Sequence, residues 1–113
     1  MKVDQLNTLP LKLVQDSQAL GLSLARLRLA RRIKQADAAL RAGLSRNTAY
    51  RLEKGDPGVA LGQVLRYLDA IAPGSTLLDL LQESDPALLA LQAREQSHRV
   101  RDMSAAELAE LDF

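Results

Sequence analysis

The fold is decided by the stretch from Lys34 to Gly55, KQADAALRAGLSRNTAYRLEKG. The small alanines before Gly43 favour a short helix that a neighbouring helix can approach closely. Gly43 readily adopts the left-handed conformation that ends a helix sharply, and Leu44 then supplies an inward hydrophobic anchor. Ser45 is a favoured N-cap for a second helix. The spacing predicts a helix-turn-helix.

The second helix of this motif separates apolar from polar positions. Ala49 and Leu52 share one face at a spacing of three residues. The remaining positions carry side chains that can reach base edges or phosphates, and these are Arg46, Asn47, Tyr50 and Arg51. We therefore expect this helix to face a nucleic acid.

Charge is distributed unevenly along the chain, although the formal net charge is only +1. Residues 26–54 carry nine Lys or Arg against two Asp or Glu, a net of +7, whereas residues 55–113 carry four against ten, a net of −6. A basic helix can simply be solvated. Here, however, the basic block coincides with the motif, and a duplex is a polyanion. The coincidence favours nucleic-acid contact.

The composition indicates one all-α domain with an appended tail. Hydrophobic residues make up 47% of the 113 positions and are mostly Leu and Ala, which favour helices. The lack of cysteine excludes disulfides and Cys-based zinc or iron–sulfur sites, and it suits a reducing cytoplasm. No apolar run reaches about 18 residues and no signal peptide opens the chain, so we expect neither a membrane span nor export. We also expect no cofactor and no metal.

Outside the motif, the chain is predicted to form an N-terminal arm (1–19), a helix-turn-helix domain (20–82) and a helical tail (83–113). Gly21 is expected to bend or interrupt the path between an apolar segment at 9–20 and a helix at 22–32. That helix has one leucine stripe at Leu20, Leu24 and Leu27. A second, at Leu22 and Leu29, is expected to pack on residues 9–20 or on a partner subunit.

Turn residues divide the second half of the chain. The run GDPG at 55–58 predicts a turn before an amphipathic helix at 61–71. Pro73 and Gly74 end that helix, and Ser75 or Thr76 caps another. Asp85-Pro86 begins a further helix, and the pattern Ser104-x-x-Glu107 predicts a capping box for a separate last helix.

Residues 20–71, LGLSLARLRLARRIKQADAALRAGLSRNTAYRLEKGDPGVALGQVLRYLDAI, resemble the lambda-repressor-like, XRE-type helix-turn-helix family. Within that family, the stretch GDPGVALGQVLRYLDAI looks most like HipB-type antitoxins. The resemblance implies a lambda-repressor-like helical bundle. It also implies that Arg28 and Glu53 form a partly buried ion pair between the first helix and the recognition helix.

The resemblance assigns further roles by position. Gln35 matches a glutamine that contacts phosphate and braces the recognition helix, and Ser45 matches a capping position that contacts phosphate. Arg46, Asn47 and Arg51 match positions that meet bases. The complete set of DNA-binding residues that we predict is Gln35, Ser45, Arg46, Asn47, Thr48, Tyr50 and Arg51.

Three positions depart from the family pattern. Lys34 stands where a Ser or Thr N-cap is usual, so the first motif helix is expected to start less cleanly. Ala38 replaces a usual Leu, which predicts either a closer helix approach or a void. Leu40 occupies a position that is usually polar and, with the second stripe, suggests a protein contact.

The sequence offers little for catalysis. It has one His, at position 98, and neither a nucleophile beside a base nor a phosphate-binding glycine loop. A second hypothesis is an interaction protein whose helix-turn-helix no longer binds DNA, although such a module would not need Arg46, Asn47 and Arg51 on one exposed helix. A third is a stand-alone XRE-type regulator.

We interpret the chain as a homodimeric, cytoplasmic and nucleoid-associated transcriptional repressor that binds double-stranded operator DNA. The resemblance implies an autoregulatory antitoxin that holds a HipA-like kinase toxin. The dimer contact is predicted in the segment 76–91. Residues predicted to contact the dimer or toxin partner are Leu78, Leu81, Leu88, Leu111 and Phe113. The acidic tail is expected to dock on the toxin, to fold back on its own dimer, or to fray.

Overall fold

The computed structural model describes the backbone of residues 4–111 and the side chains of residues 4–100. Every element in the described backbone is a helix, which confirms the expected all-α class. The helices are α1 (Gln5–Thr8), α2 (Leu11–Ala30), α3 (Gln35–Ala42), α4 (Arg46–Glu53), α5 (Leu61–Ile71), α6 (Leu77–Gln82) and α7 (Pro86–Leu111). None of the described helices combines the length and hydropathy needed to cross a bilayer.

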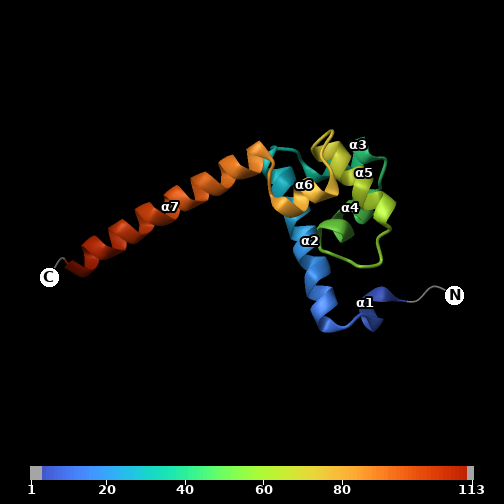
Figure 1. Cartoon of the computed structure of the whole chain (residues 1–113), viewed down its shortest axis with the longest axis horizontal. Coiled ribbons are helices and arrows are strands. Elements are labelled where there is room, and N and C mark those ends of the chain that lie inside the picture. Colours follow the sequence, from blue (N-terminus) through green and yellow to red (C-terminus); the bar gives the residue numbers. More distant parts are fainter. Residues whose placement is uncertain (1–3, 112–113) are drawn as a thin grey trace.

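Helices α2 to α6 and the start of α7 form a compact bundle (Figure 1). Helix α3 packs on α4 and α5, while α2 packs on α4, α5, α6 and α7. The apolar faces meet in one core, formed by Leu24, Leu27, Ala38, Ala39, Ala42, Ala49, Leu52, Tyr67, Leu68, Ile71, Ala72, Leu80 and Leu88. Ala38 is fully buried, so its small side chain sits inside this core rather than at the surface.

Helix α2 is continuous through Gly21, so the expected interruption there is wrong. Gly21 is buried because the backbone of the α4–α5 loop passes directly against it. A Cβ atom at Gly21 would lie 2.5 Å from the Gly55 nitrogen and 2.7 Å from the Leu52 carbonyl oxygen. Ser17 Oγ, one turn earlier, donates a 2.6 Å hydrogen bond to the Gly55 carbonyl. Gly21 allows the two backbones to pack closely. The loss of helix propensity caused by a single glycine is small in a 20-residue helix.

The second leucine stripe of α2 stays exposed. Leu22 and Leu29 are each 59% exposed. Residues 11–20 belong to the same helix and cannot fold back onto the stripe, so packing on residues 9–20 is wrong. Contact of the stripe with a partner subunit stays a prediction. The first turns of α2, before Ser17, extend beyond the bundle and lead back to α1, which Asp4 caps through its side chain (Figure 1).

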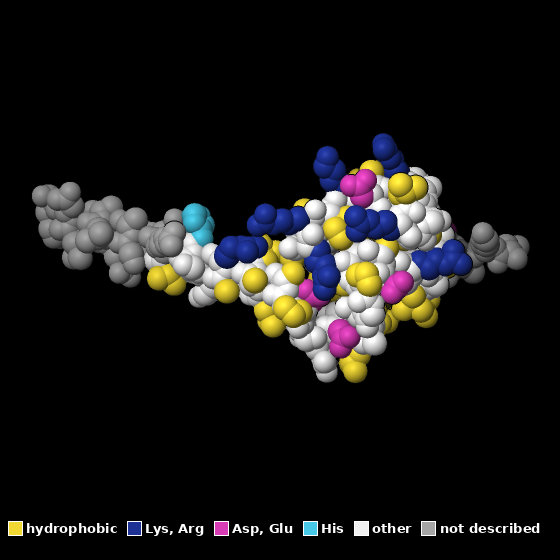
Figure 2. All heavy atoms as spheres, turned by 90° about the horizontal axis from the view of Figure 1, so that it is seen from above, with side chains coloured by type: hydrophobic (Ala, Val, Ile, Leu, Met, Phe, Trp, Pro, Cys, Tyr) yellow, Lys and Arg dark blue, Asp and Glu magenta, His cyan; other side chains and the backbone are white. Residues whose placement is uncertain are grey.

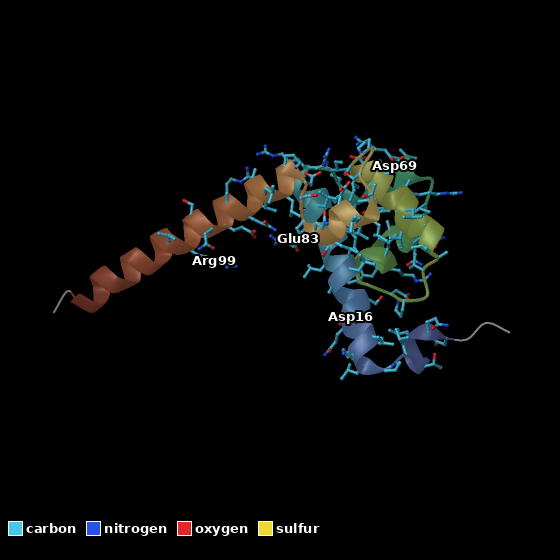
Figure 3. The ribbon with its side chains drawn as sticks, viewed as in Figure 1. Asp16, Asp69, Glu83 and Arg99 are labelled. Carbon is cyan, nitrogen blue, oxygen red and sulfur yellow. The ribbon has the colours of Figure 1, made fainter. Side chains whose placement is uncertain are left out.

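Helix α7 runs without a break from Pro86 to Leu111, a length of about 39 Å. The separate last helix expected at Ser104 is therefore wrong. No Pro or Gly interrupts residues 87–111, so the Ser-x-x-Glu pattern falls inside a continuous helix. The first turns of α7 are fixed to α2, and the remainder projects away from the bundle (Figure 1). Arg99 lies on this projecting part (Figure 3).

Two ion pairs fix the start of α7. Asp85, just before the helix, accepts from Arg31 Nη2 at 2.6 Å. Glu95, in the third turn, accepts from Arg26 Nη2 at 2.5 Å. Between them Leu88 is buried in the core and Leu91 packs against it. Charge and apolar contact together set the angle at which α7 leaves the bundle.

Candidate nucleic-acid interface

The turn between α3 and α4 has the predicted geometry. Gly43 has φ = 70°, in the left-handed region. The Leu44 N–H donates to the Ala39 carbonyl at 2.9 Å and the Gly43 N–H to the Leu40 carbonyl at 3.2 Å, which satisfies the end of α3. At the other end of α3, Lys34 provides no side-chain cap. Leu44 packs against the core as expected.

Ser45 caps α4, as the sequence predicts. Its Oγ accepts from the Thr48 N–H at 3.1 Å and donates to Thr48 Oγ1 at 2.9 Å. Thr48 is half-buried, and both its backbone N–H and its hydroxyl are bonded to Ser45. Arg46 and Asn47, in the first turn, are exposed. A helix N-terminus also attracts anions through its free N–H groups.

The exposed side of α4 continues through Tyr50 to Lys54. Tyr50 is 53% exposed. Lys54 follows one turn later and places its Nζ 5.5 Å from the centre of the Tyr50 ring. Helical spacing puts these two on the side that also carries Arg46 and Asn47. Ala49 and Leu52 face the core instead. The structure thus brings three of the predicted residues, Arg46, Asn47 and Tyr50, together with Lys54 on one polar, basic face.

Arg51 has a partner that the sequence interpretation missed. Its Nε donates to Asp56 Oδ2 at 2.7 Å. Asp56 lies in the GDPG turn, where its Oδ1 accepts from the Gly58 N–H at 2.8 Å. The Arg51 guanidinium and, after it, the Gly58 N–H hold the pKa of the Asp56 carboxyl below its usual value. An Asp followed two residues later by Gly signals such a turn, but not that an arginine joins it.

Behind this face, Glu53 of α4 is hydrogen-bonded to side chains of three other helices, α2, α3 and α5. It accepts from Arg28 Nε at 2.6 Å and Nη2 at 2.9 Å, and from Gln35 Nε2 at 3.0 Å. The Tyr67 hydroxyl donates a short hydrogen bond to the same carboxylate. The Arg28–Glu53 ion pair implied by the family resemblance is confirmed, with the two side chains 12% and 7% exposed. The bracing contact of Gln35 is also present, whereas its contact with phosphate stays a prediction.

Tyr67 is the member of this cluster that sequence reasoning overlooked. It is fully buried. Burial, followed by its hydrogen bond to Glu53, raises the pKa of the phenol well above its usual value. Residues 64, 67, 68 and 71 have the i, i+3, i+4, i+7 spacing of a buried helix face. This spacing is the sequence signal from which the burial of Tyr67 could be predicted. Among the described residues, no buried side-chain polar atom lacks a hydrogen-bond partner.

Positive charge spreads beyond α4. Figure 2 shows Lys and Arg side chains scattered over the face of the bundle seen from above, with fewer acidic side chains between them. Arg31, Arg32 and Arg41 line one shallow depression of the surface. Within residues 4–100, no group of His, Cys, Asp or Glu is arranged to hold a metal ion.

The predicted partner contacts divide into three groups. Leu78 and Leu81 are 61% and 64% exposed on α6 and are available to a partner. Leu88 is only 3% exposed because it fills the space between α7 and the core, so its assignment as a surface contact is wrong. The Leu111 side chain and Phe113 lie outside the described residues.

A family model described as a helix-turn-helix domain matches residues 19–81, which is more than half of the chain. The matched span runs from the middle of α2 to the end of α6 and contains all the predicted DNA-binding residues. Domains of this kind are typically non-enzymatic DNA-binding modules. Neither a curated protein nor a solved structure matches the chain.

Proposed function

The chain belongs to the helix-turn-helix domain family, and from this premise we propose that it is a sequence-specific repressor whose helix α4 enters the major groove of operator DNA. The observation that carries the proposal is the exposed face of α4. It presents Arg46 and Asn47 beside a capped N-terminus, with Tyr50 and Lys54 further along. Arginine suits guanine and asparagine suits adenine in the major groove. A repressor with this face blocks transcription by occupying the promoter.

Salt-dependent binding to duplex DNA tests this proposal. A duplex selected by the protein from a randomised pool is compared with an unselected duplex over a range of salt concentrations. We expect selective binding whose logarithmic affinity falls linearly with the logarithm of salt. Arg46→Ala should weaken the binding free energy for the selected duplex by about 1–3 kcal/mol and relax the base preference at one position. Arg94→Ala, on exposed α7, removes the same charge away from α4 and should leave base preference intact.

Two results would contradict this assignment. The first is equal affinity for selected and unselected duplexes. The second is an Arg46→Ala protein that keeps the wild-type base preference, which would remove Arg46 from the residues that read bases. A protein-interaction module without DNA binding would give no salt-dependent shift at all.

We further propose that the repressor is a homodimer. One recognition helix covers only a short half-site, so tight specific binding usually needs two recognition helices related by a twofold axis. The exposed leucines of α6, Leu78 and Leu81, and Leu89 on α7 support a contact surface in the segment 76–91. The expected consequence is a selected duplex with twofold-related half-sites.

The finer proposal is that the repressor is also the antitoxin of a HipA-like kinase toxin. The resemblance of residues 55–71 to HipB-type antitoxins supports it. Removal of residues 104–113 should weaken toxin binding or neutralisation in a co-expression assay, while operator affinity stays within about twofold. Full neutralisation together with lost DNA binding would instead assign the tail to the dimer. Lack of any complex with such a kinase would leave a stand-alone regulator.

A further inference from the structure

We propose that Asp56 is a positioning residue that fixes the Arg51 guanidinium for recognition of one guanine. Asp56 lies outside the motif helices and was not among the predicted DNA-binding residues. The inference rests on the proposed function, because it concerns how α4 reads a base. It adds a residue in the α4–α5 loop to the determinants of sequence preference.

Asp56 is itself held firmly, at both carboxylate oxygens and at its backbone. Its Oδ1 accepts from the Gly58 N–H at 2.8 Å, and its own N–H donates to the Arg51 carbonyl at 3.0 Å. Its Oδ2 is therefore presented at a fixed place, where it accepts from Arg51 Nε at 2.7 Å. The space around the pair is tight. A Cβ atom at Gly58 would lie 3.1 Å from Asp56 Oδ1 and 3.4 Å from Arg51 Nη2.

This pairing leaves the outer edge of the guanidinium for a ligand. Arg51 is still 41% exposed. Within the described residues, its hydrogen bond to Asp56 uses Nε, so Nη1 and Nη2 remain as a parallel pair of donors. Guanine offers O6 and N7 as a matching pair of acceptors in the major groove. A long side chain that is already held in place also loses less conformational entropy on binding.

The negative charge of Asp56 also has a simpler possible consequence. A carboxylate beside a DNA-reading helix repels phosphates and weakens binding to every sequence alike. Orientation and repulsion give opposite results when the carboxylate is removed. Loss of orientation lowers discrimination between bases, whereas loss of repulsion raises affinity for all duplexes and leaves discrimination unchanged.

Asp56→Asn is the most informative variant. Its remaining side-chain oxygen can still accept from the Gly58 N–H and keep the turn, but its amide nitrogen is a donor and cannot accept from Arg51 Nε. Asp37→Asn is the matched control. It makes the same change in charge at an exposed carboxylate in the first turn of α3, which is not paired with Arg51. Thermal unfolding verifies that both variants keep the fold.

The experiment measures affinity for the selected duplex and for duplexes with single base-pair changes. Wild-type protein, Asp56→Asn, Asp37→Asn, Arg51→Ala and the double variant of Asp56 and Arg51 are compared. We expect Arg51→Ala and Asp56→Asn each to lose about tenfold discrimination at the same guanine. The double variant should lose no more than Arg51→Ala alone. Asp37→Asn should bind all duplexes slightly more tightly with unchanged discrimination.

A second readout does not depend on DNA. In the free protein, the Arg51 Nε–H resonance should exchange slowly with solvent in the wild type and in Asp37→Asn, and rapidly in Asp56→Asn. If Asp56→Asn behaves like Asp37→Asn on DNA, or Arg51→Ala leaves discrimination unchanged, the inference is overturned while the proposed function stands. A wild-type protein that does not discriminate between selected and unselected duplexes overturns both.

Discussion

At the scale of single residues, Glu53 links the fold to α4, the proposed DNA-reading helix. It ends α4, and its carboxylate is bonded to α2, α3 and α5 through Arg28, Gln35 and Tyr67. A buried carboxylate is tolerable only while its partners surround it, because desolvation of a charge is costly. The cluster therefore sets the position of α4 within the bundle rather than contributing much net stability.

Removal of Arg28 tests this role. Arg28→Ala deletes two donors to Glu53 and a third to the Ile33 carbonyl. It leaves the Glu53 carboxylate, with its side chain 7% exposed, without its counter-charge. We expect the free energy of unfolding to fall by about 3 kcal/mol. Urea denaturation measures the change, with exposed Arg66→Ala as the control. A loss equal to that of the control would show that solvent or another group compensates Glu53.

At the scale of elements, α2 can cross close to the α4–α5 loop only because two positions, Gly21 and Gly55, have no side chain there. Gly55 has φ = 76°, and Gly21 lies against its backbone. Any Cβ atom at Gly21 meets backbone atoms, which cannot rotate away as a flexible side chain could. The close approach brings the GDPG turn, and with it Asp56, beside α4.

Gly21→Ala should therefore destabilise the protein by about 1–3 kcal/mol, because the two segments must move apart. Gly62→Ala is the matched control. Gly62 lies in α5, and a Cβ atom there has nothing within 4 Å. That substitution should stabilise the helix by about 0.5–1 kcal/mol. Thermal unfolding of both variants gives the comparison, and equal effects of the same sign would contradict it.

Short-range sequence patterns were sufficient to predict the helix-turn-helix motif, but not the course and contacts of the long helices α2 and α7. Gly43 and Ser45 act through neighbours within a few residues, so the sequence alone predicts their roles. The function of Gly21 depends on Gly55, which lies 34 positions further along the chain (55 − 21), and no local pattern reports that contact. The same holds for Asp56, whose turn is predictable while its bond to Arg51 is not. Ser104 shows the converse, a local capping pattern overridden by a continuous helix.

The attachment of α7 should depend on acid pH. Burial raises the pKa of Asp85, but its hydrogen bonds with Arg31 and with backbone N–H groups outweigh this effect, so the folded pKa lies below the ordinary value of 3.8. A lowered pKa means that the stabilisation is complete above the ordinary value and is lost as pH falls through the folded one. The pKa of Glu95 is lowered in the same direction, chiefly by Arg26.

We therefore expect α7 to loosen from α2 below about pH 4, before the bundle unfolds. Amide hydrogen exchange near residues 86–95, followed over acid pH, measures this change. Asp85→Asn should already exchange faster at neutral pH and show a weaker dependence on pH. Exchange rates in this segment that follow those of α5 at every pH would instead show that α7 opens only with global unfolding.

At the scale of the whole molecule, the bundle exposes apolar surfaces that lie outside α4 and that contact with one DNA half-site would not use. The molecule measures 67 × 32 × 24 Å because α7 projects from it. Leucines remain exposed on α6 and on the first turns of α7, at one end of the bundle. On α2, Leu22 and Leu29 form a separate exposed stripe. In the proposed operator-binding dimer, we expect one of these surfaces to lie at the twofold axis.

We expect the α6 surface to form the dimer contact. Leu78→Asp combined with Leu81→Asp puts two charges on residues that are already 61% and 64% exposed, so the monomer should still fold. The pair should convert a dimer into a monomer in sedimentation analysis and reduce operator affinity by more than about tenfold, because each half-site then binds alone. Leu61→Asp is the control, since Leu61 is equally exposed, at 63%, but lies at the start of α5. A variant that stays dimeric would move the contact to Leu22 and Leu29, where the same substitution can be made.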